Sequence, residues 1–453
     1  MKKRILGLSL AGAALAGVAA LSLASCKNVV MNNDGEIFHI YVWNQEFKGF
    51  FEKYVSDERA QFVQAAETKD DTKKPATTHY KGKVVKWTEV PSDGGAYQKA
   101  LDTALENNAT ASESDKVDLF LAEADYILKY TDSDLTRNVK DMGVTTPNIY
   151  KYTEEAASST KGEVKGVSFQ CCPAGVIYRR SIAQKVLGVS TPEEVQKKIS
   201  DWTKFDAVAA QMKAQGYYMT ASYAETYRAF SNNVSKPWVD SSNKLQFDDQ
   251  INTWMTQAEK YVDKGYTLTA GIWDTECTNE MYADGKAFCY FGPAWYYNFC
   301  MNNAQDADKG CFGDWGLVEG PAKYFWGGTW MLAPVGGSND DLTRDVMNAF
   351  VNDHDVCYNL VAKEGQFSNN QSVNKEYADT GKGNAFLGGQ NDTALYLELA
   401  KGIKFQNITL YDQYCNEGLQ TYFAEYLKGT VTKDKAIANF KEYIETQCKG
   451  VKA

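Results

Sequence analysis

Short apolar runs of strand length alternate with helical patterns over the first third of the chain. Residues 37–43 (IFHIYVW), 83–90 and 117–121 are rich in β-branched and aromatic side chains, which predicts three buried strands. Apolar residues recur at helical spacing over residues 47–55 and 97–105, after the first and second of these runs. Strands and helices that alternate at this spacing predict an α/β fold.

A longer extended run lies in the middle of the chain. Residues 164–179 (VKGVSFQCCPAGVIYR) exceed the length of an ordinary buried strand, and Pro173 and Gly175 interrupt them. We therefore expect the chain to cross from one lobe to another here. A capping box with proline at the first helical position then starts a helix at Thr191, and Gly216 ends the next helix.

The rest of the pattern predicts more helices and a few polar loops. The additional helices are expected at residues 126–140, 147–157, 248–263, 342–351, 356–363, 394–403 and 432–446. The polar segments 68–78, 365–373 and 407–414 are expected to be loops.

Polar and aromatic residues follow two of the predicted strands directly. Trp43, Asn44, Gln45 and Glu46 come after the first strand. The third strand is followed by two carboxylates and a tyrosine, which are Glu123, Asp125 and Tyr126. Because the loops at the carboxyl ends of strands in an open α/β sheet face one crevice, we expect these side chains to lie in it. Asp125 equally suits the N-cap of a helix that begins at Tyr126.

Residues 286–330 are exceptionally rich in aromatic side chains. An aromatic ring can stack on the C–H face of a sugar while neighbouring polar groups bond its hydroxyls, so this segment predicts a carbohydrate cleft. An aromatic core is the alternative for each ring taken alone. Ten of its rings are Phe288, Tyr290, Phe291, Trp295, Tyr296, Tyr297, Phe299, Trp315, Trp326 and Trp330.

The N-terminus has the pattern of a bacterial lipoprotein signal. Three basic residues precede an apolar run over residues 5–23, and Leu23-Ala24-Ser25-Cys26 closes it as a lipobox. We expect residues 1–25 to be removed and Cys26 to carry lipid, which tethers the protein outside the membrane. Loss of the three basic residues changes the formal net charge from −10 to −13. Such an acidic chain argues against binding of nucleic acid.

Cysteine and histidine patterns predict no metal centre and no catalytic cluster. Besides Cys26 there are nine cysteines, an odd number without zinc spacing, so most are expected to be buried thiols. The sequence is compatible with a disulfide between Cys300 and Cys311 but does not establish it. Residues 306–310 (DADKG) lack the later glutamate of an EF-hand, and the three histidines are isolated. We expect neither metal nor cofactor, and no enzymatic activity.

The order of these motifs resembles that of a known family. The lipobox, the strand that leads to Asp125, the VKGVSFQCCPAGVIYR run, GKAFCYFGPAW and FWGGTW occur in the order seen in extracellular solute-binding proteins of carbohydrate ABC importers, the maltose-binding-protein-like branch. The resemblance implies a two-lobed periplasmic-binding-protein-like fold of class II, whose hinge has three crossings. It implies a monomer that binds a carbohydrate and delivers it to importer permease subunits.

The resemblance also implies lobe boundaries and site residues. Crossings are expected near residues 169–173, 325–328 and 372–377, so 37–170 with 326–375 would form the N-terminal lobe, and 171–325 with 376–453 the C-terminal lobe, after a lipidated linker at 26–36. By position, Asp125 matches a carboxylate that bonds sugar hydroxyls and Trp295 a tryptophan that stacks on sugar, although Ala294 is an extra residue. The expected ligand-binding residues are Trp43, Asn44, Glu46, Asp125, Tyr223, Glu225, Arg228, Trp273, Trp295, Trp326, Gly327, Gly328, Tyr411 and Asp412.

Two other functions fit parts of this pattern. A surface-anchored glycan hydrolase would use two of the scattered carboxylates at a set separation. The same receptor fold could instead bind a peptide, an amino acid or a polyamine, for which Arg228 and Glu225 are the candidate charged pair.

Overall fold

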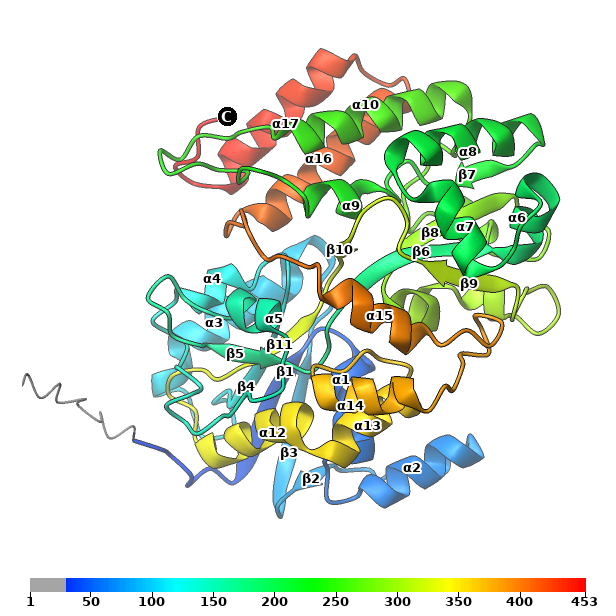
Figure 1. Ribbon diagram of the computed structural model, residues 1–453. Coiled ribbons are helices and arrows are strands. Elements are labelled where there is room, and N and C mark those ends of the chain that lie inside the picture. The colour runs from blue at the N-terminus through cyan, green and yellow to red at the C-terminus, as the bar shows by residue number, and fades with distance from the viewer. Residues whose placement is uncertain (1–29) are drawn as a thin grey trace, which may run out of the picture. The chain divides into compact units, whose positions relative to one another are not determined.

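Two mixed β-sheets, each covered by helices, organise the part of the chain that the structure describes (Figure 1). The computed structural model describes residues 30–453, so the predicted signal peptide and Cys26 lie outside it. Residues 31–453 form one compact unit. Within residues 30–453, none of the helices has both the length and the apolar character needed to cross a membrane.

The first sheet has six strands in the order β2-β3-β1-β4-β11-β5. Strands β3, β1 and β4 run parallel, while β11 pairs antiparallel with β4 and β5. The strands span Ile37–Val42 (β1), His79–Tyr80 (β2), Lys83–Glu89 (β3), Leu119–Glu123 (β4), Gly166–Ser168 (β5) and Thr329–Leu332 (β11).

The second sheet is built around β6, which pairs antiparallel with β8, β9 and β10, while β7 runs parallel to β8. Its strands span Pro173–Arg179 (β6), Tyr218–Thr220 (β7), Ala287–Gly292 (β8), Trp315–Val318 (β9) and Tyr324–Phe325 (β10).

The helices fall into two groups, one with each sheet. With the first sheet lie Gln45–Tyr54 (α1), Arg59–Thr68 (α2), Ala96–Asn107 (α3), Leu128–Thr131 (α4), Lys151–Ala156 (α5), Asp340–Asn352 (α12), His354–Ala362 (α13) and Gln371–Asp379 (α14). With the second lie Arg180–Leu187 (α6), Pro192–Ile199 (α7), Trp202–Ala214 (α8), Tyr227–Ser231 (α9), Asp249–Lys264 (α10), Thr275–Asn279 (α11), Asp392–Ala400 (α15), Asp412–Leu427 (α16) and Lys433–Gln447 (α17).

The chain passes between the sheets at the first two places expected from the sequence. Residues 169–172 join β5 of the first sheet to β6 of the second, and residues 326–328 join β10 to β11. Residues 372–377 lie within α14, which packs against both α13 and α15. The lobe boundaries at single-residue detail stay predictions.

The third predicted strand lies two residues later than expected, at Leu119–Glu123. The backbone N–H and C=O of Val117 are bonded by the side chain of Asn108, which removes Val117 from pairing with a strand. At the other end, Glu123 pairs with Thr329 of β11, which extends the strand. The shift brings Glu123 to the carboxyl end of β4.

The predicted helix at residues 126–140 was wrong apart from the four-residue α4. Thr136 Oγ1 donates to the Tyr130 carbonyl, and the Arg137 N–H donates to Ala333, so side-chain and long-range bonds replace the helical ladder. Other helices were missed, among them α2, just before the expected loop at 68–78, and α6. Helices α14 and α16 begin inside the expected loops at 365–373 and 407–414.

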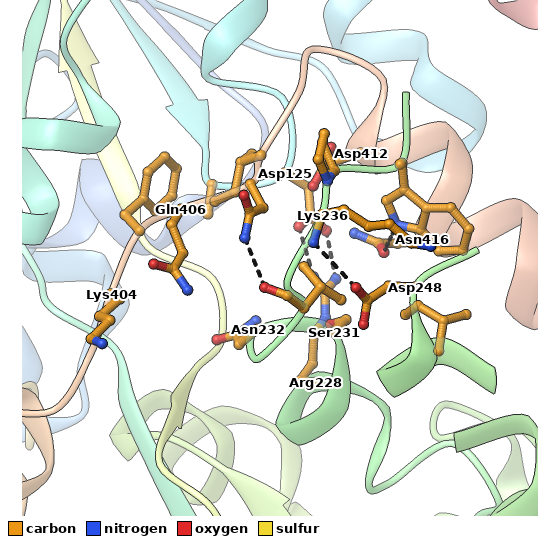
Figure 2. Close-up of a pocket in the computed structure, with 18 of the residues that line it drawn as sticks. Asp125, Arg228, Ser231, Asn232, Lys236, Asp248, Lys404, Gln406, Asp412 and Asn416 are labelled. Carbon is orange, nitrogen blue, oxygen red and sulfur yellow. Dashed lines mark hydrogen bonds and ion pairs between the residues drawn. The ribbon is translucent and has the colours of Figure 1, made fainter. Parts of the chain in front are cut away.

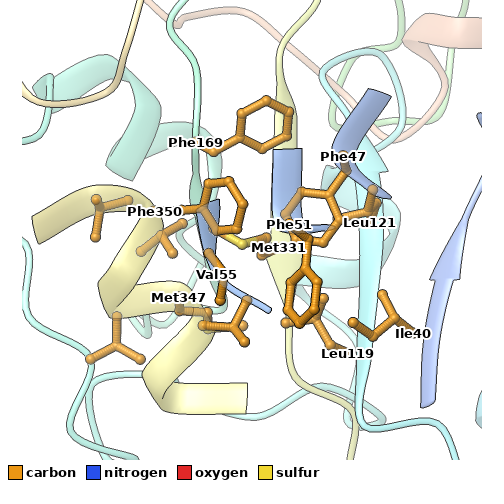
Figure 3. Close-up of a cluster of buried hydrophobic side chains, with 14 of the residues drawn as sticks. Ile40, Phe47, Phe51, Val55, Leu119, Leu121, Phe169, Met331, Met347 and Phe350 are labelled. Carbon is orange, nitrogen blue, oxygen red and sulfur yellow. The ribbon is translucent and has the colours of Figure 1, made fainter. Parts of the chain in front are cut away.

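An aromatic core fixes α1 on the first sheet (Figure 3). The rings of Phe47 and Phe51 on α1 are at most 1% exposed, and Phe47 packs on Phe169 and Phe350. Full burial of a side chain of this size stabilises the fold by about 1.5–3 kcal/mol. This packing holds the N-terminus of α1, with Asn44 as its cap, at the edge where the chain crosses between sheets.

Candidate ligand-binding cleft

A cavity of about 640 Å³ lies where the two crossing segments meet the N-terminus of α1. Its volume falls within the range of small-molecule sites in proteins. It is lined by Trp43, Asn44, Gln45, Glu46, Gly49, Phe50, Lys53, Glu123, Gln170, Trp273, Trp295, Phe299, Cys300, Trp326, Gly327, Gly328, Thr329 and Glu364. Eight of the residues expected from the sequence therefore lie together here.

Tryptophans form one wall of this cavity. Trp295 meets Trp326 edge to face with ring centroids 5.0 Å apart, and its Nε1 donates to the Trp326 carbonyl at 3.1 Å. Trp273 lies 5.8 Å from Trp326 and keeps 61% of its surface exposed. The hydrogen bond orients Trp295, while Trp273 presents a free aromatic face at the cavity mouth.

The aromatic segment 286–330 divides between core and cavity. Trp295, Phe299 and Trp326 line the cavity, as the carbohydrate-cleft interpretation requires. Seven other rings of the segment are at most 2% exposed, so the aromatic-core alternative holds for these seven. They are Phe288, Tyr290, Phe291, Tyr296, Tyr297, Trp315 and Trp330.

The N-terminus of α1 brings polar groups to the opposite side. Asn44 Oδ1 accepts from the Glu46 N–H at 3.0 Å, which caps the helix. The Glu46 carboxylate lies 3.5 Å from the amide nitrogens of Gln170 and Gln366. Burial raises the pKa of Glu46 to about 7. Trp43 packs edge to face on Tyr97, with centroids 5.4 Å apart.

Asp125 makes a bidentate ion pair with Arg228 of α9, which belongs to the group of helices on the second sheet's side. Arg228 Nη1 and Nη2 donate to Asp125 Oδ1 at 2.7 Å and Oδ2 at 2.5 Å. The Asp125 N–H donates to Glu123 Oε2 at 2.6 Å, so the last residue of β4 and the turn that follows it bring the two acids together. Desolvation, followed by the neighbouring Asp125 carboxylate, raises the pKa of Glu123. The helix N-cap expected as an alternative for Asp125 is replaced by this ion pair.

A second cavity of about 270 Å³ continues from the first. The two share Trp43, Glu123, Trp273 and Trp326. Asp125, Tyr126, Arg228, Gln413 and Glu417 are among its other lining residues. The Asp125–Arg228 pair therefore borders the second part of a continuous cleft.

A smaller polar pocket lies on the other side of the same ion pair. Figure 2 shows Arg228, Lys236, Asp248 and Asp412 around it. Its volume of about 40 Å³ has room for one or two water molecules and no sugar. Asp412 Oδ1 accepts from the N–H and hydroxyl of Thr409, and burial raises its pKa to about 7.

Residues 73–383, more than half of the chain, match the family model described as bacterial extracellular solute-binding protein. The chain belongs to this family. No curated protein sequence matches it.

Solved structures of other solute-binding proteins share the fold of this one. An extracellular solute-binding protein of family 1 has a TM-score of 0.71 at 16% identity, over 90% of this chain and 99% of that chain. An ABC transporter-associated binding protein from B. animalis subsp. lactis, in complex with β-1,6-galactobiose, has a TM-score of 0.66 at 15% identity, over 93% and 100%. The galacto-N-biose-/lacto-N-biose I-binding protein from Bifidobacterium longum, in complex with lacto-N-biose, has a TM-score of 0.65 at 12% identity. The match covers 93% of this chain and 100% of that chain.

Three expected site residues of this solute-binding protein lie in packed regions. Tyr223 is 6% exposed in a hydrophobic cluster, against which Tyr411 also packs. Glu225 is 2% exposed, and its Oε2 accepts from the Phe291 N–H at 3.0 Å. Burial raises the pKa of Glu225 to about 8. Tyr223 and Glu225 therefore pack in the protein interior, while Arg228 of the same segment lines the second cavity.

Several residues that line the cleft were not predicted as site residues. Glu123 was absent from the expected site residues, although the strand-end motif had already placed its carboxylate in the crevice beside Asp125. The others come from distant parts of the chain, and no local pattern marks them. Among them are Lys53, Gln170, Thr329, Glu364, Gln413 and Glu417.

All nine cysteines from Cys171 to Cys448 are free thiols. The disulfide between Cys300 and Cys311 that the sequence left open is not formed. Cys300 lines the larger cavity beside Phe299, and burial raises the pKa of its thiol. Within residues 30–453, no group of three or more potential ligands of the histidine, cysteine or acidic type is placed to hold a metal ion.

Proposed function

We propose that this solute-binding protein captures a carbohydrate, specifically an oligosaccharide, in the tryptophan-lined cleft and delivers it to the permease subunits of an ABC importer. The observation that carries this proposal is the cavity of about 640 Å³ walled by Trp43, Trp273, Trp295 and Trp326.

The chemistry of the lining suits a sugar. Indole faces stack on the apolar faces of a pyranose, and carboxylates and amides accept from and donate to its hydroxyls. Glu46, Gln170 and Asn44 supply such groups opposite the tryptophans. Several rings along two joined cavities provide more than one stacking position, which favours an oligosaccharide over a monosaccharide. The sugar complexes of the two structural relatives from bifidobacteria support the same ligand class.

Both lobes contribute to the cleft. Trp43 and Glu46 follow β1 of the first sheet, while Trp273 and Trp295 flank β8 of the second. A ligand that contacts both lobes favours their closed arrangement, which a permease could recognise. In this proposal, residues 37–170 with 326–375 form the N-terminal lobe, and residues 171–325 with 376–453 form the C-terminal lobe.

The location of the protein is part of the proposal. A lipid on Cys26, after removal of residues 1–25, would anchor the protein to the outer side of the cell membrane. The linker at residues 26–36 would let a monomeric receptor reach its permease. Metabolic labelling with a fatty-acid analogue tests this step, and loss of the label in Cys26→Ser is the expected result. Equal labelling of the original protein and the Cys26→Ser variant would contradict the proposed lipid anchor on Cys26.

A thermal-shift screen tests the ligand class. The purified protein is heated with mono- and oligosaccharides, amino acids and polyamines, and the sugars are analysed for products afterwards. A ligand at 100 times its dissociation constant adds about 2.7 kcal/mol to stability, which gives a measurable shift. We expect a shift with a sugar that is recovered intact. Cleavage of the sugar would support a glycan hydrolase instead, and a shift with amines or amino acids alone would overturn the carbohydrate assignment.

A further inference from the structure

The charges that line the cleft are not balanced. Seven charged side chains line the two joined cavities: Glu46, Lys53, Glu123, Asp125, Arg228, Glu364 and Glu417. Each of the two cations already contacts a carboxylate, since Lys53 bonds Glu364 and Arg228 bonds Asp125. Among residues 30–453, no lysine or arginine forms an ion pair with the remaining three acids.

Glu46 and Glu123 are the two unbalanced acids of the larger cavity. The contacts of the Glu46 carboxylate are amide nitrogens at 3.5 Å, which are neutral. Glu123 Oε2 accepts from the backbone N–H of Asp125, which brings a second carboxylate close to it. A neutral ligand would bury these charges further without supplying a counter-charge, at a cost in free energy.

Aromatic faces lie beside these acids. Gly327 has a φ of +75°, and a Cβ added to it would lie 3.4 Å from Trp295 Nε1 and 3.5 Å from Glu123 Oε1. The bare backbone of Gly327 therefore leaves a space that both the Glu123 carboxylate and the Trp295 indole border. Trp326 forms the adjoining wall, 5.0 Å from Trp295. Aromatic faces that surround a site with acidic groups bind ammonium ions by cation–π attraction.

We propose that the cleft is selective for a sugar that carries a cationic amino group, whose ammonium lies between Glu123, Glu46 and the tryptophan wall. This inference rests on the proposed carbohydrate function and narrows its ligand class to amino sugars. Burial is the largest cause of the raised pKa values of Glu46 and Glu123, and a bound ammonium would lower both by favouring the charged carboxylates.

Matched sets of sugars test the inference by isothermal titration at pH 7. Each set contains a neutral sugar, its free-amine form and its N-acetyl form: glucose, glucosamine and N-acetylglucosamine; galactose and its two derivatives; cellobiose, the glucosamine β-1,4-disaccharide and N,N′-diacetylchitobiose. The N-acetyl member has the same substituent position without the charge. Spermidine provides a cation without a sugar ring.

We expect the free-amine member of at least one set to bind ten-fold or more tightly than its neutral and N-acetyl counterparts. Equal or weaker binding of the amine in every set that binds would overturn the inference and leave the carbohydrate function in place. Binding of spermidine with none of the sugars, or no binding by any of them, would overturn both proposals.

Substitutions that remove one charge locate the ammonium. In Glu123→Gln and in Glu46→Gln we expect affinity for the amine sugar to fall about ten-fold more than affinity for its neutral counterpart. Glu106→Gln on the exposed face of α3 removes the same charge outside the cleft and controls for net charge. An equal fall for both sugars in the cleft variants, or an equal fall in the control, would contradict the assignment.

Discussion

Trp273 offers the cleanest residue-level test of the cleft, because it lines both cavities and yet is 61% exposed. Its loss should leave the fold unchanged. In Trp273→Ala we expect sugar affinity to fall about ten-fold, since stacking contributes about 0.5–1.5 kcal/mol beyond the contact area. Titration calorimetry measures the loss, and the thermal midpoint of the free protein should stay within a degree.

The matched control is Phe312→Ala, an exposed ring that lies outside both cavities. The sugar affinity of the Phe312→Ala variant should equal that of the original protein. Unchanged affinity in Trp273→Ala would remove this ring from the site, and a fall in both variants would point to a general effect of lost surface aromatics.

Trp295 gives the second residue-level prediction. Trp295→Ala removes an indole from the cavity together with its hydrogen bond to the Trp326 carbonyl. We expect sugar binding to be lost with the fold intact, whereas Trp295→Phe, which keeps an aromatic face, should retain part of it. Retained affinity in Trp295→Ala, measured by calorimetry, would contradict the role in stacking.

Glu225 makes stability depend on pH. Its pKa is about 8 in the folded chain and near 4.3 in an unfolded one, so between these values the folded state holds a proton that the unfolded state releases. Stability therefore falls as pH rises from about 5 to 8, by up to about 1.4 kcal/mol per pH unit from this group. Glu46 and Asp412, with raised pKa values of about 7, add in the same direction.

Thermal midpoints of the ligand-free protein at pH 5, 6.5 and 8 test this dependence. The midpoint should fall with pH, and Glu225→Gln should flatten the decline because glutamine keeps an acceptor for the Phe291 N–H without the titration. A variant with the original slope would exclude Glu225 as the cause.

Residues 43–46 and the tryptophans were predictable because each follows from a local pattern: a strand end that must open on the crevice, or rings too numerous for a surface. Glu225 and Tyr223 show the limit of that reasoning. A tyrosine-rich segment has the same sequence pattern whether it lines a cleft or fills a core, and the contacts that decide between them come from distant residues such as Phe291.

At the scale of elements, the start of α7 followed directly from its sequence. Thr191 Oγ1 accepts from the Glu194 N–H, as the capping box predicts, and Pro192 occupies the first turn. The Glu194 carboxylate accepts from the Thr191 hydroxyl. Thr191→Ala should lower stability by about 1 kcal/mol. Thr253→Ala in the interior of α10, where alanine favours helix, should not. Equal thermal midpoints for the two variants would contradict the capping role.

Elements with strong local signals were predicted well, and those set by distant contacts were not. Strand β1 and the helices α10, α12 and α17 match their expected positions to within about two residues at either end. Strand β4 begins later than expected because the side chain of Asn108 bonds the backbone of Val117. The helix expected after this strand is interrupted where the Arg137 N–H donates to the Ala333 carbonyl. Neither contact leaves a trace in the local pattern.

At the scale of the whole molecule, the Asp125–Arg228 pair joins the two sheets across the cleft. Both side chains are 16% exposed, so the pair is screened less than one on the surface. Asp125→Asn should therefore let the ligand-free lobes separate, and we expect a larger radius of gyration by small-angle X-ray scattering. Asp206→Asn breaks the pair with Lys260 within the second lobe and should leave the radius unchanged. An unchanged radius in Asp125→Asn would show that the pair does not hold the lobes.

The central claim is that one cleft between two lobes binds a sugar without altering it. Isothermal titration with the sugar identified by the thermal-shift screen, followed by chromatography of the recovered ligand, tests it most directly. We predict saturable binding of one sugar per chain and quantitative recovery of intact sugar. Absence of saturable heat, a stoichiometry other than one, or cleaved sugar would contradict the claim.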